Sequence, residues 1–142
     1  MKKLMILSLV LYVVSFFLPS LEFAKSTQGN QTPVYEVWKG FECFGMGMLG
    51  VATLTNMTAL SNFLYIISMV SIYLKRHALA LSSAILGAVL AGTIFNIIGK
   101  DFPGDSGGVT ILTLHQMLYG SYVWLLSFIL LTYTTYCIVS EK

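Results

Sequence analysis

Charged residues are scarce in this sequence. Only 10% of its 142 residues are Asp, Glu, Lys or Arg, whereas 56% are hydrophobic. Soluble domains contain roughly 25% charged residues, so the composition indicates a protein built for a solvent other than water. The formal net charge is +2, and no cluster of Lys and Arg forms the basic face that nucleic-acid binding needs. We therefore predict that the chain contacts the lipid bilayer and does not bind nucleic acid.

Two functional classes lack their characteristic residues here. The sequence has only two cysteines, Cys43 and Cys137, so no C-x-x-C pair is present and a quinone-linked disulfide oxidase is excluded. The topology predicted below puts the two cysteines on opposite sides of the membrane, too far apart for a disulfide. The long apolar runs contain no Asp, Glu, Lys or Arg, which excludes the small multidrug exporters, because their mechanism depends on a glutamate in the first helix.

A possible catalytic motif occurs at residues 104–108. The run Gly-Asp-Ser-Gly-Gly resembles the nucleophile motif of chymotrypsin-like serine proteases. Those enzymes need two β-barrels and a histidine upstream of the serine, and here the upstream His77 is predicted on the opposite side of the membrane. We interpret the run as a turn, and we predict that the protein is not an enzyme and has no cofactor.

Four apolar segments dominate the chain, at about 4–21, 57–74, 78–98 and 114–139. Each is close to the roughly 20 residues that a helix needs to cross a bilayer. Lys2 and Lys3 before the first segment also fit a secretory signal, but no A-x-A cleavage site follows Pro19. We predict a single all-α integral membrane domain over 1–142, an antiparallel four-helix transmembrane bundle with external elements at 22–56 and 99–113.

The external region 22–56 carries a second helical pattern. Between Val34 and Thr55, apolar residues that include Trp38 and Phe41 recur at helical spacing, with Glu and Lys on another side. This pattern predicts an amphipathic interfacial helix between the first and second crossings. Trp38 and Phe41 are our candidates for contact with a partner.

The basic residues set the predicted orientation. Lys2, Lys3, Lys75, Arg76 and Lys142 fall on one side, and Lys25, Lys39 and Lys100 fall on the other. Cytoplasmic loops are richer in Lys and Arg, so we predict a multi-pass protein with both termini in the cytoplasm. The short Met-Lys-Lys start and the minimal loops are typical of a bacterial inner-membrane protein.

A ladder of small residues marks the third segment. It consists of Ala80, Ala84, Gly87, Ala88 and Gly92, spaced three or four residues apart. Small side chains at this spacing let a neighbouring backbone approach closely. We predict that the ladder packs helices together, either within the molecule or between two copies.

Two asparagines, Asn62 and Asn96, lie inside predicted crossings. An amide in hydrocarbon is costly unless it is hydrogen-bonded, so both should face the bundle interior. Together with His115 and Gln116 they form a candidate polar pocket. Interhelical hydrogen bonds that fix the register are the alternative.

Cys43, Met46 and Met48 form the only candidate metal site, a C-x-x-M-x-M cluster. Soft sulfur ligands of this kind bind Cu(I). A methionine-rich packing surface explains the same residues. We predict no bound metal and keep an external Cu(I) site as an alternative.

Three short motifs carry a resemblance to a known group. They are Ser-Phe-Phe-Leu-Pro at 15–19, Trp-Lys-Gly at 38–40 and Gly-Ser-Tyr-Val-Trp-Leu-Leu-Ser at 120–127. In these motifs the chain resembles small uncharacterised four-helix proteins of bacterial inner membranes. The resemblance implies a topology and a location, and it brings no activity or catalytic residue.

These patterns predict that the protein acts by binding and not by catalysis. We expect a non-enzymatic protein that binds a membrane protein, as immunity proteins against membrane-active toxins and small assembly or accessory factors do, or that associates with itself. The alternatives are a small-ligand or lipid site within the bundle and the external Cu(I) site.

Overall fold

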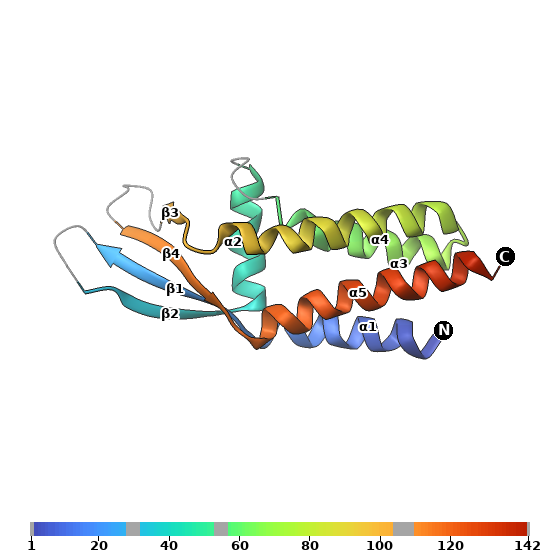
Figure 1. The fold of residues 1–142 in the computed structure, drawn as a ribbon, viewed down its shortest axis with the longest axis horizontal. Helices are drawn as coiled ribbons and strands as arrows, with labels where there is room; N and C mark the ends of the chain where they lie inside the picture. The colour runs from blue at the N-terminus through green and yellow to red at the C-terminus, as the bar shows by residue number, and fades with distance from the viewer. Residues whose placement is uncertain (1, 28–31, 53–56, 104–109, 142) are drawn as a thin grey trace.

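The computed structural model describes residues 2–27, 32–52, 57–103 and 110–141. Its helices are α1 (Lys2–Ser15), α2 (Gly40–Ala52), α3 (Leu60–Tyr73), α4 (His77–Gly92), the short 3-10 helix η1 (Thr93–Ile97) and α5 (Tyr119–Ser140). Its strands are β1 (Pro19–Thr27), β2 (Val34–Lys39), β3 (Asp101–Pro103) and β4 (Thr110–Met117). Helices α1, α3, α4 and α5 pack side by side at one end, the sheet lies at the other, and α2 crosses between them (Figure 1).

The predicted all-α fold is wrong, because the protein contains an antiparallel sheet of four strands in the order β2-β1-β4-β3. The first predicted crossing, 4–21, ends as a helix at Ser15, and β1 begins at Pro19. The last, 114–139, begins as the end of β4, and α5 starts only at Tyr119. The regions 22–56 and 99–113 that we predicted as external hold most of the sheet.

Alternating burial explains why these segments are strands. In β1, Leu21 and Phe23 are buried, whereas Glu22 between them is not. In β4, Leu112 and Leu114 are buried on either side of the less buried Thr113. A period of two is the signature of a strand with one face on a core. Because each strand directly adjoins an apolar helix, the sequence reads as one long apolar segment.

The predicted helix over 34–55 is also wrong in its first part. Residues 34–39 form β2, and the described part of the helix is α2, which begins at Gly40. Residues 53–55 of the prediction lie outside the described residues. Gly40 starts this helix because a Cβ atom there would overlap the carbonyl oxygen of Ser15 and lie 2.7 Å from Cα of Phe16. The Gly40 N–H donates to the Leu18 carbonyl at 3.2 Å. Glycine therefore allows α2 to turn directly against the end of α1.

Two helices in the described ranges are long and apolar enough to cross a membrane, α4 continued by η1 (His77–Ile97, 21 residues) and α5 (22 residues). At 1.5 Å per residue they span about 32 and 33 Å, which matches a hydrocarbon layer of about 30 Å. The helices α1 and α3 have 14 residues each, or about 21 Å. The predicted four-helix transmembrane bundle is therefore not supported.

The helical half exposes many large apolar side chains and buries small polar ones beside a core that includes Tyr65 and Phe128. Ser8, Ser68 and Thr134 have no exposed surface, whereas Val89 in α4 and Ile129 in α5 are 61% and 60% exposed. In an 18-residue apolar stretch of each of the two long helices, only 33% and 28% of the residues are buried. A core helix of a soluble protein would be mostly buried and would turn its apolar side inward.

The small residues of α4 pack within the molecule. Ala80 and Ala84 are buried, and the Ala80 carbonyl accepts a hydrogen bond from the Ser68 hydroxyl at 2.9 Å. A Cβ atom at Gly87 would lie 3.3 Å from Leu64 Cβ, on α3. Gly92 is different, because a Cβ atom there would meet nothing within 4 Å. Ala88 is half-buried. Most of the predicted ladder thus contacts the molecule's own helices.

A tight turn joins α3 to α4. The Arg76 N–H donates to the Ser71 carbonyl and the Lys75 N–H donates to the Ile72 carbonyl, so two carbonyls at the end of α3 are satisfied. Lys75 has a φ of 57°, a conformation that usually favours glycine. This turn and both chain termini lie at the end of the helices away from the sheet (Figure 1).

Candidate functional site

A cavity of about 80 Å³ lies where the helices meet the sheet. Residues from the end of α1, the start of β1, α2, α3, η1 and α5 line it. None of the lining residues is Asp, Glu, Lys, Arg or His. We call it the junction cavity, and its wall combines apolar residues with Asn62 and three serines.

Asn62 of α3 is the central polar residue of the junction cavity. Its side chain is buried, with 6% of the residue exposed. The Oδ1 atom accepts hydrogen bonds from the Tyr12 hydroxyl and from Nε1 of Trp124, both at 3.0 Å. The Nδ2 atom donates to the Ala59 carbonyl at 3.3 Å. One amide therefore connects α1, α3 and α5, as expected for a polar residue that fixes helix positions.

Three serines of the junction cavity hold backbone groups where the strand leaves the helices. The hydroxyls of Ser15 and Ser20 donate to the carbonyls of Tyr12 and Leu18. The Ser121 hydroxyl donates to the Ser20 carbonyl at 2.7 Å. These bonds satisfy carbonyls that helix ends and chain turns leave open. The serines thus line the cavity with neutral polar groups that already have hydrogen-bond partners.

Cys43 lines the same cavity as a protonated thiol. Its Sγ atom lies 3.9 Å from the carbonyl oxygen of Trp38, which accepts a weak hydrogen bond. Burial, with a smaller contribution from the neighbouring Glu42, raises the pKa of the Cys43 thiol to about 12. A thiol that stays protonated at neutral pH is a poor nucleophile.

The other candidate ligands of the Cu(I) alternative are not placed. The side chains of Met46 and Met48 lie outside the described residues, and so does the Gly-Asp-Ser-Gly-Gly run at 104–108. Within the described ranges, no three His, Cys, Asp or Glu side chains come close enough together to hold a metal ion.

The structure separates the four residues of the predicted polar pocket. Asn62 is buried, but Asn96 is exposed on η1. His115 and Gln116 are exposed on β4, where the His115 ring lies 5.1 Å from the Tyr35 ring. Nε2 of Gln116 donates to Glu22 at 2.6 Å. The amide groups and the imidazole therefore do not meet in one pocket.

Asn62 has partners that sequence reasoning missed. Tyr12 and Trp124 supply the two donors to its amide oxygen. Both are aromatic residues with a polar atom, inside apolar segments, and such atoms usually find a partner when buried. That signal was present in the sequence. The spacing of residues does not show, however, that the helices at 2–15 and 119–140 pack together beside Asn62.

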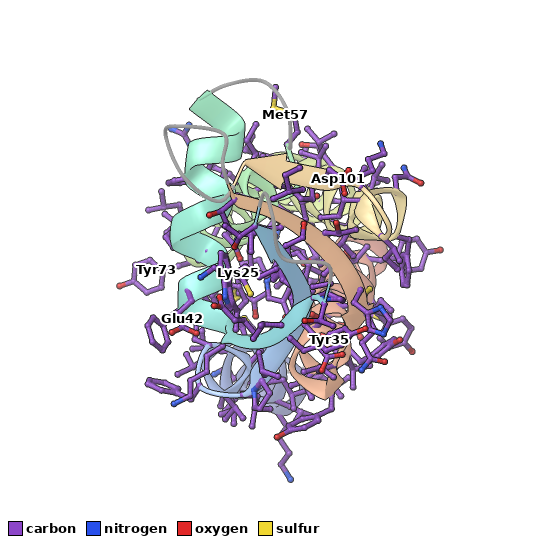
Figure 2. All side chains as sticks on the ribbon, turned by 90° about the vertical axis from the view of Figure 1, so that its left-hand side faces the viewer. Lys25, Tyr35, Glu42, Met57, Tyr73 and Asp101 are labelled. Carbon is purple, nitrogen blue, oxygen red and sulfur yellow. The ribbon has the colours of Figure 1, made fainter. Side chains whose placement is uncertain are left out.

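The edge strand β2 carries an exposed apolar surface. Val34, Tyr35 and Val37, which we call the edge strip, are 57%, 53% and 51% exposed. Tyr35 and Val37 point to one face of the strand and Val34 points to the other. Figure 2 looks onto this end of the molecule, where Tyr35 is labelled beside the strand. Of the two predicted partner contacts, Phe41 is 51% exposed next to the strip, but Trp38 packs inward with its ring 4.6 Å from Phe23.

The face of the same strand that carries Trp38 also carries an ion pair, because Glu36 lies two residues from Trp38. Nζ of Lys25 lies 2.9 Å from Oε1 of Glu36, on neighbouring strands. The hydrogen bond from Lys25 holds the pKa of the Glu36 carboxyl below its ordinary value. Both side chains are more than a third exposed, so the pair adds little stability.

Comparison with protein families, with curated proteins and with solved structures found no match to this chain. The functional argument therefore depends on the molecule itself.

Proposed function

We propose that this is a non-enzymatic membrane protein that binds another membrane protein, or a membrane-active toxin, through the edge strip of its sheet. The edge strip is the observation that carries the proposal. Edge strands are usually kept from pairing with other chains by charged side chains or by a helix or loop that covers them. An exposed apolar edge strand favours such pairing. An immunity protein or an accessory factor for assembly acts by this kind of contact.

The membrane part of the proposal starts from the reversed polarity of the helices. Lipid tails are the solvent in which exposed Val, Ile and Leu are stable and buried Ser and Thr hydroxyls need internal partners. We infer that α4 with η1 crosses the bilayer once and α5 crosses it again. The exposed apolar faces of α1 and α3 contact the same acyl chains.

Charge distribution supports an orientation with both termini in the cytoplasm. The end with the termini carries Lys2, Lys3, Lys75 and Arg76. In the described ranges, the sheet end carries Lys25, Lys39 and Lys100 together with four acidic residues, Glu22, Glu36, Glu42 and Asp101. The basic end belongs in the cytoplasm, which fits a multi-pass protein of a bacterial inner membrane.

Site-directed labelling tests this orientation. In a background with Cys43 and Cys137 replaced by alanine, we expect a membrane-impermeant maleimide to label an Asp101→Cys variant on intact spheroplasts. A Lys75→Cys variant should react only after the membrane is permeabilised. Equal labelling of both variants before permeabilisation would reject the two crossings.

Photo-crosslinking tests the partner contact. A benzoylphenylalanine at position 37 should give a discrete adduct in the native membrane, because Val37 is an exposed residue of the edge strip. The same group at position 129 is the matched control, since Ile129 is equally apolar and even more exposed, but lies on the helical surface. An adduct of twice the protein's mass would identify a second copy as the partner.

Two results would contradict the proposal. One is the absence of any protein adduct at position 37 under conditions where the variant accumulates normally. The other is a protein adduct at position 129 alone, which would move the contact to the helices.

A further inference from the structure

We propose that the junction cavity binds the acyl chain of a neutral lipid, with an ester carbonyl of that lipid accepting a hydrogen bond from the Asn62 amide. This inference does not depend on the edge strip or on the identity of a protein partner. It rests on the size, the charge and the hydrogen-bond donors of the cavity.

The size of the cavity favours a linear chain. A water molecule needs at least about 10–15 Å³ of such volume, and a cavity of about 150 Å³ accepts benzene. The junction cavity has about 80 Å³. It therefore has room for a short stretch of hydrocarbon and a carbonyl, but not for a sterol or a quinone ring.

The absence of charge among the lining residues favours a neutral ligand. No lining residue is ionisable at neutral pH, because the thiol of Cys43 keeps its proton. Moving a carboxylate or phosphate into such a site costs several kcal/mol unless a cation compensates it. A fatty acid anion should therefore bind much more weakly than an uncharged ester of the same chain.

The hydrogen bonds of Asn62 determine which ligand group it recognises. Its Oδ1 atom already accepts two hydrogen bonds, from Tyr12 and Trp124. Its Nδ2 atom has two hydrogens, and the bond to the Ala59 carbonyl uses one of them. Asn62 is thus ready to donate and not to accept, so the matching ligand group is an acceptor such as a carbonyl.

A series of aromatic rings marks the side from which the chain would enter. The Phe16 ring at the cavity wall lies 5.9 Å from the Phe44 ring, which lies 6.4 Å from the Phe63 ring. Phe63 is 41% exposed on the outer face of α3. An acyl chain that begins at Asn62 would continue along these rings toward the lipid-facing surface.

Trp124 provides the measurement, because its indole lines the cavity and donates to Asn62. The sequence has two tryptophans, so a Trp38→Phe variant reports on Trp124 alone. In detergent, a monoacylglycerol brominated on its chain should quench this fluorescence saturably. The unbrominated lipid should compete and restore it, and the brominated fatty acid at pH 8 should bind at least about a hundredfold more weakly.

A matched pair of substitutions separates the cavity from the general protein surface. Ala59→Leu fills the cavity from its wall, and we expect it to abolish saturable quenching. Ala78→Leu makes the same change at an exposed position of α4 and should leave quenching unchanged. Quenching that rises linearly with probe, that the unbrominated lipid does not reverse, or that persists in Ala59→Leu would overturn the proposal. Because the competition arm uses no cavity variant, it remains decisive if Ala59→Leu does not fold.

Discussion

The helical half and the sheet half of this molecule solve opposite packing problems. In the sheet half, Leu21, Phe23 and Leu114 are buried against η1, while Glu22 and Gln116 face outward and bond to each other. In the helical half, Ser8, Ser68 and Thr134 are buried beside a small core that includes Phe128 and Leu131, and many other large apolar residues face outward. The same chain therefore places polar groups outside at one end and inside at the other.

In the helices, buried hydrogen bonds add to the packing of the aromatic core around Tyr65 and Phe128, whereas the buried face of the sheet is mainly apolar. The Ser8 hydroxyl bonds to the Tyr65 hydroxyl at 2.6 Å and to the Ser127 carbonyl at 2.8 Å, and so links three helices. In hydrocarbon there is no hydrophobic force between helices, so close packing and such bonds hold them together. The four predictions that follow test the contrast.

A charge on the outer surface should have opposite consequences in the two halves. Val89→Lys places an ammonium group in the middle of the α4–η1 segment. If lipid surrounds this segment, the charge should make membrane insertion less favourable by about 3 kcal/mol. Val37→Lys makes the same change on the edge strip, and unfolding free energy should change by less than about 0.5 kcal/mol. Membrane-fraction yield and detergent unfolding measure both. Two equally mild effects would mean that water surrounds both halves.

The connection between the halves should be intolerant of one added methyl group. A Cβ atom at Gly120 would lie 2.5 Å from the Pro19 carbonyl oxygen and from Ser20 Oγ. Gly120→Ala should therefore lower the unfolding free energy by about 2–3 kcal/mol. Gly92→Ala is the control, because nothing lies within 4 Å of its added Cβ, and a gain of up to about 1 kcal/mol is expected. A Gly120→Ala protein as stable as the control would contradict this close approach.

The two asparagines should differ as the burial of their amides differs. Asn62→Leu leaves the Tyr12 hydroxyl and the Trp124 indole without their acceptor, at a cost of about 2 kcal/mol. Asn96→Leu changes an exposed amide and should cost less than about 0.5 kcal/mol. Thermal unfolding in the same detergent compares them. Equal losses would show that the hydrogen bonds of Asn62 do not hold the helices together.

The smallest expected effect lies in the Lys25–Glu36 pair of the sheet. Because the pKa of Glu36 is lowered in the folded protein, its stabilisation is present above the unfolded pKa of about 4.3 and disappears as the pH falls through the lower folded value. Glu36→Gln should lower stability by only a few tenths of a kcal/mol at pH 7. That difference should vanish once the pH falls below the folded pKa of Glu36, where both proteins are uncharged at position 36. A difference that stays constant with pH would assign the effect to packing.

The sequence predicted the apolar helices better than the sheet. The segment predicted at 78–98 lies within one residue of the α4–η1 helix, and α3 falls inside 57–74. Helices are local, so their apolar length is readable from the chain. The sheet depends on pairs such as Thr27 with Thr110. Pairing between residues so far apart produces no local sequence pattern from which it could be predicted. The alternation in β1 and β4 was visible, but it merged with the neighbouring apolar helices.

The candidate site was predictable only in part, for the same reason. Asn62 stands out as an amide in an apolar segment, and burial with hydrogen bonds is what hydrocarbon requires of it. The junction cavity around it needs residues from six elements, and the positions of Ser20 and Trp124 beside Asn62 follow from the tertiary fold alone. Asn96 carries the same amide but lies on η1, where the helix narrows and its side chain faces outward.

The pairing of β1 with β4 also constrains how the protein is made. During synthesis β1 leaves the ribosome early, directly after α1, whereas β4 is among the last segments to appear. The central pair of the sheet therefore stays open while α3 and α4 are delivered to the membrane, and contacts this far apart in sequence form slowly. Although β2 can pair with one edge of β1 at once, the other edge stays open to a wrong neighbour until β4 is made.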